Sequence, residues 1–314
     1  MSLEASGISW TDATLNSLYG CSACSVGCRL CYAMNRVNRH SLNPRMNGHG
    51  RFDGLVKDGR FTGQLLFEPR HLYAVLKVKA PRRIFVNEFS DLLHDALPMK
   101  VILEHIRVFR AAPRHQFQVL TKRSRRLAEL DAAIMAEFAS WPANLWQGVS
   151  VCSAEEIEMQ RIEDLGATKA ALKWVSFEPW ISNLNCPLRQ AWPDLVEILR
   201  RNEIAWIVIG GESGARDESN LITLDDARYL VEASKSAGCR VHFKQLGTAL
   251  AIRLGVYSTR GRGEHRAKGG NPDQWPEELR IREWPELVSD TTDDASVFQP
   301  AYDSSQWLHF NGTD

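Results

Sequence analysis

The chain has 314 residues, and its 38 Lys and Arg balance 38 Asp and Glu, so the formal net charge is zero. This balance argues against strong non-specific nucleic-acid binding, although a local basic face is still allowed. Hydrophobic residues make up 44% of the chain, which excludes a disordered protein. No apolar run reaches the roughly 18–20 residues of a membrane span, and the N-terminus lacks a secretory signal, so we expect a cytoplasmic protein without membrane contact.

Short apolar, β-rich runs alternate with helix-like stretches along most of the chain. We expect one strand near residues 7–20 and six more in runs that end abruptly in polar residues. These six runs are RRIFVNEFS (82–90), HQFQVLTKR (115–123), NLWQGVSVC (144–152), LKWVSFEPW (172–180), IAWIVIGGE (204–212) and RVHFKQLG (240–247). Continuous apolar runs of this length are typical of strands buried on both faces, as in a parallel sheet.

Two of the intervening stretches carry clear helix signals. Residues 99–113 place their apolar positions near one face, and residues 223–238 open with Thr223 as an N-cap and end at Gly238. The βαβα alternation predicts an α/β fold, either a single complete or partial (β/α) TIM-type barrel over residues 1–285 or a doubly wound open sheet. Residues 286–314 hold six acidic residues and no Lys or Arg, so we expect an acidic C-terminal tail.

Four of the seven cysteines, Cys21, Cys24, Cys28 and Cys31, have the spacing C-x2-C-x3-C-x2-C. In a reducing compartment such clustering favours metal ligation. In one interpretation, three thiolates hold a [4Fe–4S] cluster whose open iron chelates S-adenosylmethionine (SAM), and an electron from an external donor then generates a 5′-deoxyadenosyl radical. In the other, all four thiolates close a zinc site, although zinc sites usually separate their C-x2-C pairs by a dozen or more residues.

In β/α barrels the chemistry lies at the carboxyl ends of the strands. The polar residues there are the candidates for binding SAM: Asn87, Ser90, Asp91, Thr121, Lys122, Ser150, Ser176, Gly210, Gly211, Glu212 and Ser213. Glu178, Lys122 and Lys244 are the candidate catalytic residues, because a carboxylate that ends an apolar strand needs a cationic partner. A purely structural ion pair at Glu178 and a tight turn at Gly210–Gly211 are the alternatives. Basic residues just after the cysteines, Arg36, Arg39, His40, Arg45 and Arg51, are candidates for a phosphate-binding rim.

Several longer stretches carry a resemblance to a known family. They are ISWTDATLNSLYGC, SVGCRLCYA, VNEFSDLLHDALP, FQVLTKRSRRL, GVSV, SFEPW, IVIGGESGARD, FKQLG and KGGNPDQWPEELRIREWP, in this order. On these residues the chain resembles the phage Gp37/Gp68 family (three-cysteine-motif, DUF5131), which is similar to radical SAM barrels such as spore photoproduct lyase. The resemblance implies a barrel of the radical SAM kind with a [4Fe–4S] cluster and SAM as cofactors. Because members are frequent in phages, it also implies a DNA or RNA substrate.

The resemblance leaves the third cluster ligand open. The family spacing C-x6-C-x2-C selects Cys21 beside Cys28 and Cys31, whereas the usual radical SAM spacing C-x3-C-x2-C selects Cys24. The aromatic that usually precedes the last cysteine is replaced by Leu30, and Tyr32 follows instead. GGES (210–213) resembles the Gly-Gly-Glu motif that binds the methionine amine in radical SAM enzymes, but it follows a late strand, so NEFSD (87–91) is the alternative for that role.

The sequence therefore predicts a radical SAM enzyme that modifies or repairs a nucleic acid or nucleotide-type substrate. It would need an external electron donor, and a partner protein is a further candidate. The alternative is a zinc-stabilised four-cysteine module that binds nucleic acid without SAM chemistry.

Overall fold

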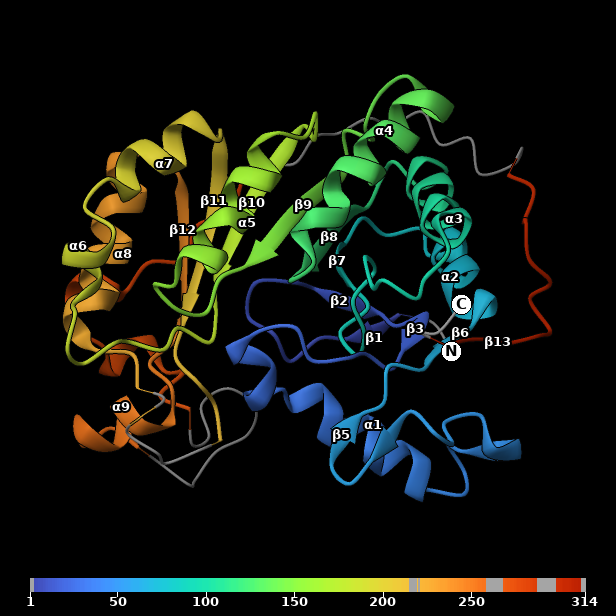
Figure 1. Ribbon diagram of the computed structural model, residues 1–314, viewed down its shortest axis with the longest axis horizontal. Coiled ribbons are helices and arrows are strands. Elements are labelled where there is room, and N and C mark those ends of the chain that lie inside the picture. The colour runs from blue at the N-terminus through green and yellow to red at the C-terminus, as the bar shows by residue number, and fades with distance from the viewer. Residues whose placement is uncertain (1–2, 215–218, 220, 258–267, 287–297, 312–314) are drawn as a thin grey trace.

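The computed structural model describes residues 3–214, 219, 221–257, 268–286 and 298–311. Its centre is an eight-stranded sheet in the order β1-β2-β7-β8-β9-β10-β11-β12, curved into a half-barrel (Figure 1). β1 (Glu4–Ala5) pairs antiparallel with β2 (Ala13–Leu15), whereas all other neighbours in this sheet are parallel.

The predicted strands are confirmed. They are β7 (Arg83–Val86), β8 (Gln116–Thr121), β9 (Leu145–Ser150), β10 (Leu172–Phe177), β11 (Ile204–Gly210) and β12 (Arg240–Gln245), each inside one predicted run, and β2 lies inside the region predicted for the first strand. From β2 onward the strand order follows the chain order without reversal, which excludes the doubly wound alternative. Within the described residues β1 and β12 stay the two edges of the sheet, so the barrel is partial rather than complete.

The helices of the crossovers lie along the outer, convex side of the sheet (Figure 1). The α-helices are α1 (Tyr32–Leu42), α2 (Pro69–Ala74), α3 (Met99–Arg110), α4 (Leu127–Phe138), α5 (Glu156–Gly166), α6 (Leu188–Ala191), α7 (Leu195–Arg201), α8 (Leu224–Ser236) and α9 (Thr248–Arg253). The 3-10 helices are η1 (Val26–Leu30), η2 (Gly48–Gly50), η3 (Val75–Lys77), η4 (Ser124–Arg126), η7 (Pro272–Gln274) and η8 (Glu277–Leu279). None of the described helices is long and apolar enough to cross a membrane.

Both predicted helices form, α3 within residues 99–113 and α8 within residues 223–238. The Thr223 side chain accepts a hydrogen bond from the Asp226 N–H, as expected for an N-cap. Gly238 follows α8 with a φ of 88°, a left-handed conformation that suits glycine.

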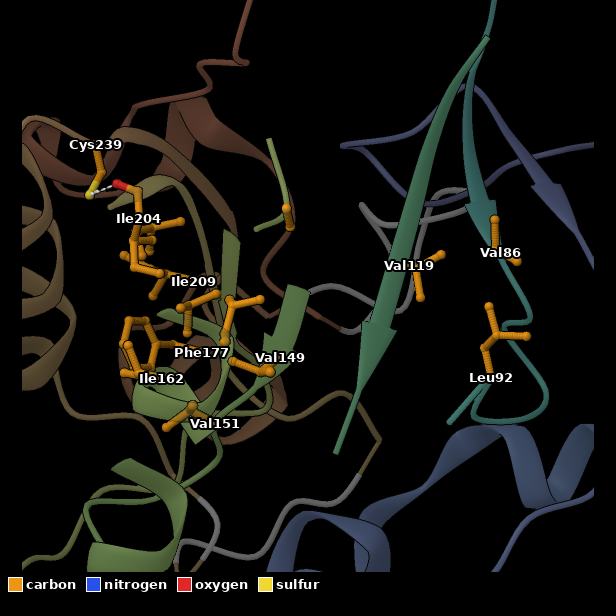
Figure 2. Packing of buried hydrophobic residues seen from close by; sticks show 14 of the residues in the cluster. Val86, Leu92, Val119, Val149, Val151, Ile162, Phe177, Ile204, Ile209 and Cys239 are labelled. Atoms are coloured by element: carbon orange, nitrogen blue, oxygen red, sulfur yellow. Dashed lines mark hydrogen bonds between the residues drawn. The ribbon is translucent and has the colours of Figure 1, made fainter. Parts of the chain in front are cut away.

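Two cores lie on opposite faces of the half-barrel. The larger one fills the space between the strands and the outer helices and includes Val119, Val149 and Ile209 (Figure 2). Cys239 belongs to it as a buried thiol, and its Sγ lies 3.0 Å from the Ile204 carbonyl oxygen.

The inner face carries the aromatic side chains of the same strands. Trp146, Trp174 and Trp206 form a cluster with Trp10 and Phe85. The ring centroids of Trp174 and Trp206 are 5.1 Å apart, and those of Trp10 and Trp174 are 5.4 Å apart. Because side chains alternate along a strand, these indoles face the concave side and close the floor of the half-barrel.

Residues 20–64 form a separate lobe, here called the cysteine lobe, which lies against the carboxyl ends of the strands (blue in Figure 1). It contains the cysteine cluster, η1, α1, and the hairpin of β4 (Val56–Lys57) and β5 (Arg60–Phe61). Its small core packs Val37, Phe52 and Leu55 against Tyr19 and Phe89.

A second sheet closes the base of this lobe, with the order β13-β6-β3. β3 (Leu18–Tyr19) and β13 (Leu308–Phe310) both pair antiparallel with β6 (Leu65–Phe67). A part of the predicted tail therefore forms a strand, while residues 287–297 and 312–314 of that tail lie outside the described residues.

Candidate functional site

A cavity lies between the cysteine lobe and the carboxyl ends of β7 to β12. It holds about 1130 Å³ of empty space counted out to its open mouth. The predicted site residues that line it are Cys21, Cys28, Cys31, Asn87, Ser90, Asp91, Thr121, Lys122, Ser150, Ser176, Glu178, Gly211, Glu212, Ser213 and Lys244. Of the predicted site residues, Cys24 and Gly210 do not line it.

The neighbours of Cys28 lower the pKa of its thiol. Its Sγ accepts from the Cys24 N–H at 3.5 Å and lies 3.6 Å from the Ser25 hydroxyl oxygen. A hydrogen bond from the Cys24 thiol, opposed by partial burial and assisted by the Lys122 ammonium, lowers the pKa of Cys28 to about 4. The same hydrogen bond raises the pKa of Cys24. The surroundings of Cys28 therefore favour its thiolate form, and exposed Cys24 donates to it through the backbone N–H.

Lys122 supplies positive charge next to this thiolate. Burial lowers the pKa of Lys122, but electrostatic interactions with Cys152, Cys28 and Cys31 outweigh burial and raise it. The ammonium therefore stays charged at the wall of the cavity, where it balances the negative charge of the cysteine cluster.

Arg123 fastens the start of the cysteine loop to the end of β8. Its guanidinium donates to the carbonyl and the hydroxyl of Ser22, both at 2.8 Å, and to the Cys21 Sγ at 3.6 Å. It also pairs with the Asp91 carboxylate at 3.2 Å. The Ser22 hydroxyl in turn lies 2.9 Å from Nε2 of His94. Arg123 thus connects the loop before the first helix of the lobe to the half-barrel.

Asp91 is an acceptor for the loops rather than an open carboxylate. It accepts from the Thr121 hydroxyl at 2.7 Å, from the Leu93 N–H at 2.9 Å and from the Lys122 N–H at 3.0 Å. Burial raises the pKa of Asp91, but Arg123 and these donors outweigh it and hold the pKa below its usual value. Asp91 and Thr121 were predicted to bind SAM. Their side chains instead bind each other and the backbone of neighbouring loops, and so fix the shape of the site.

Ser90 and Asn87 also bind the chain that enters the lobe. The Ser90 hydroxyl donates to the Gly20 carbonyl at 2.7 Å. The Asn87 Oδ1 accepts from the Ser17 and Leu18 N–H groups, each at 3.0 Å. The Asn87 Nδ2 is buried without a hydrogen-bond partner among the described residues. An unpaired buried donor costs free energy, so this atom suits an acceptor on a ligand.

Glu178 forms its ion pair with Lys244 across the ends of β10 and β12. Lys244 is thus the cationic partner of Glu178, whereas Arg123 pairs with Asp91. The pair lines the cavity together with Ser150 and Ser176.

The Gly210–Gly211 step has a structural requirement at its second residue. A Cβ on Gly211 would lie 2.3 Å from the Leu246 carbonyl oxygen, whereas a Cβ on Gly210 would meet its nearest neighbours at an ordinary 3.5 Å. Glycine is needed at 211 because β11 leaves the sheet there close to the end of β12, and this close approach brings Glu212 and Ser213 to the cavity.

Whether this cavity could hold a metal ion or an iron–sulfur cluster depends on the ligand atoms that line it. Within the described ranges, no three side chains of His, Cys, Asp or Glu are grouped closely enough to hold a metal ion as they stand. Three cysteines of one short motif nevertheless line the same cavity, and Lys122 helps to lower the pKa of one of them, Cys28. Soft thiolates are the ligands that iron–sulfur clusters and zinc prefer.

Over residues 5–276 the sequence matches the family described as "Protein of unknown function (DUF5131)". The chain belongs to the DUF5131 family. The match covers the cysteine lobe and every strand of the half-barrel from β2 to β12, so the residues that line the cavity of this DUF5131 protein lie within it. No curated protein and no solved structure matched the chain.

Two parts of the DUF5131 cavity were missed by sequence reasoning. The clamp of Arg123 on Ser22 was not predicted, because Arg123 belongs to a basic run that is typical of a solvated helix start. The contact of Cys152 with the cysteine loop was also missed. A Cβ on Gly27 would lie 2.4 Å from the Cys152 Sγ, and the only hint was a cysteine placed just beyond a strand end.

Proposed function

We propose that this DUF5131 protein is a radical SAM-type enzyme that modifies or repairs a nucleic acid or nucleotide-type substrate. The observation that carries the proposal is that three motif cysteines and the predicted carboxyl-end residues line a single cavity. In a β/α barrel this is the face where active sites lie. The resemblance to the phage Gp37/Gp68 proteins and to radical SAM barrels supports the same reaction class.

We propose Cys21, Cys28 and Cys31 as the ligands of a [4Fe–4S] cluster. All three line the cavity and are partly buried, whereas Cys24 is exposed and donates to Cys28. When bound, such a cluster would supply the electron that cleaves the sulfonium of SAM. Lys122 and Arg123 would balance the thiolate charge, and Arg123 would hold Cys21 in place through its hydrogen bonds to the loop.

The remaining cavity residues would bind SAM. The Asn87 Nδ2 is a buried donor suited to the carboxylate of the methionine part, and Glu212 is an acceptor suited to its ammonium. Ser150 and Ser176 present hydroxyls to the same space, and the Trp10 indole lies beside them as an apolar wall for the adenine. The Glu178–Lys244 pair would position the substrate at the mouth of this site.

Anaerobic purification and reconstitution test the cluster and separate it from the zinc alternative. We expect a brown protein with stoichiometric iron and sulfide, and loss of both in Cys21→Ser, Cys28→Ser and Cys31→Ser. Cys24→Ser is the matched control and should keep the cluster. A colourless protein with one equivalent of zinc, lost in all four variants, would instead support the four-cysteine zinc module.

SAM chemistry is tested separately on the reconstituted protein. With SAM and dithionite, we expect 5′-deoxyadenosine and methionine to form, as measured by chromatography. Asn87→Ala should bind SAM more weakly, since it removes the unpaired donor. A protein that keeps its cluster but neither binds nor cleaves SAM would refute the proposed reaction class.

A further inference from the structure

The cysteine lobe carries a strongly basic surface in a chain of zero net charge. Between residues 29 and 60 there are seven basic residues, Arg29, Arg36, Arg39, Arg45, Arg51, Lys57 and Arg60, and two acidic ones, Asp53 and Asp58, so the segment carries +5 (7 − 2). Of the basic residues, Arg51 is partly buried and pairs with Glu68, whereas the other six are exposed. The positive field of the protein is therefore concentrated beside the cavity.

Helix α1 places part of this charge in line with the mouth of the cavity. Ala33 and Val37 pack into the lobe, whereas the helix face about a third of a turn away is exposed. Tyr32 begins that face, is 45% exposed and also lines the cavity. Arg36 and Arg39 follow on the same face, about 6 and about 10 Å further along the axis by the rise of an α-helix.

Neither Arg36 nor Arg39 forms a close ion pair within the described part of the chain. Arg36 approaches Glu88 at 3.6 Å, and its side chain remains 56% exposed. Arg39 is exposed and has no ion pair within the described part of the chain. Their guanidinium groups therefore present donors to the solvent next to an aromatic ring, a combination typical of surfaces that bind single-stranded nucleic acids.

We propose that the exposed face of α1 is the track for a single-stranded nucleic acid that delivers its reacting nucleotide into the cavity. Arg36 and Arg39 bind successive phosphates, and Tyr32 stacks on the base next to the one that enters. A base must leave its stack to reach atoms at the bottom of an enzyme pocket, so an aromatic platform at the entrance compensates for the lost stacking. This inference rests on the proposed function, because it identifies the substrate of that site as a polymer.

The test measures binding and not catalysis. A fluorescently labelled single-stranded oligonucleotide of about 15 bases is titrated with the reconstituted protein at about 50 to 200 mM NaCl, and its anisotropy is recorded. Arg36→Gln/Arg39→Gln should lower the slope of log K against log salt by about 1.4, since each single-strand phosphate contact contributes about 0.7. Arg70→Gln/Lys100→Gln removes the same charge from exposed positions on α2 and α3 and should leave the slope unchanged.

Variants of Tyr32 test the stacking contact. Tyr32→Ala should bind about 5- to 150-fold more weakly at all salt concentrations, whereas Tyr32→Phe keeps the ring and should bind like the original protein. The inference is overturned if the oligonucleotide does not bind at low salt, if both double variants weaken it equally, or if poly-glutamate of the same length competes equally well.

The outcome is independent of the reaction class. SAM cleavage in the absence of nucleic acid should be equal in the original protein and in Arg36→Gln/Arg39→Gln. Oligonucleotide binding that depends on Arg36 and Arg39, without formation of any 5′-deoxyadenosine, would support the binding surface on α1 and refute the proposed function. Normal SAM cleavage with an unchanged salt slope in Arg36→Gln/Arg39→Gln would do the reverse.

Discussion

Replacing Arg123 with Gln removes the cation that holds the cysteine loop. In the folded protein, the side chains of Arg123 and Asp91 are only 5% and 9% exposed, so the pair is largely shielded from water. Glutamine keeps a hydrogen-bonding amide but leaves the Asp91 carboxylate buried without its opposite charge. It also shortens the reach to Ser22 and Cys21.

The magnitude follows from the contacts that Asp91 retains. Removing one partner of a buried ion pair costs about 3–5 kcal/mol. Asp91 keeps the Thr121 hydroxyl and two backbone N–H donors, so we expect the lower end, about 3 kcal/mol. At about 2 °C per kcal/mol for a chain of this size, the Tm should fall by about 6 °C.

Calorimetry and chemical denaturation of Arg123→Gln measure this loss. Arg228→Gln is the control, because the side chains of Arg228 and its partner Glu278 are 46% and 47% exposed, and such a solvent-screened pair contributes little to stability. The double variant Arg123→Gln/Asp91→Asn should recover part of the loss, since it removes the stranded charge.

The stability loss in Arg123→Gln should depend on pH. Without Arg123 only the Thr121 hydroxyl and the two backbone N–H donors oppose the desolvation of Asp91, so its folded-state pKa is higher than in the original protein, and protonation at lower pH relieves the buried charge. The stability difference between the original protein and Arg123→Gln should therefore be smaller at pH 5 than at pH 8. The proposed role of Arg123 in holding the cysteine loop would be refuted by a stability difference that stays constant with pH. A difference equal to the stability loss in Arg228→Gln would refute it as well.

Two further predictions concern packing and acid stability. Gly27→Ala should destabilise the protein by about 1–3 kcal/mol, because its Cβ would lie 2.4 Å from the Cys152 Sγ, and Cys152→Ala should restore the lost Tm in the double variant. Burial lowers the pKa of His105 to about 4 and that of His242 to about 3, so between pH 6.5 and these values the unfolded state binds more protons and stability falls on acidification. In urea titrations, His242→Gln should make this fall shallower by about 1.4 kcal/mol per pH unit near pH 5, whereas equal stability at pH 7 and pH 5 in the original protein would contradict the prediction.

The strands and their carboxyl ends could be predicted because both depend on local sequence. An apolar run that stops at a polar residue marks where a parallel strand leaves the sheet, and the topology then brings residues as distant as Asn87, Ser176 and Lys244 to one cavity. The Thr223 cap is equally local. For the same reason the placement of most site residues follows from the strand pattern alone.

The function of each side chain within the cavity could not be predicted in the same way. Asp91 and Thr121 bind loops and not open space, which depends on the path of residues 20–31 past the end of β8. The pairing of β13 with β6 joins Phe310 to Leu65, far apart in the sequence, and three-residue strands leave too short a pattern to detect. Non-local contacts of this kind become visible only in three dimensions.

The pairing of β3 with β6 has a consequence for how such proteins can diversify. Leu18 lies opposite Phe67, so the chain departs for the cysteine lobe and returns from it at neighbouring points. An inserted segment whose two ends lie side by side can become longer, shorter or differently charged without disturbing the half-barrel to which it is attached. Exchanging residues 32–62 between related chains is therefore a route to new substrate preference that leaves the floor of tryptophans and the cavity wall intact.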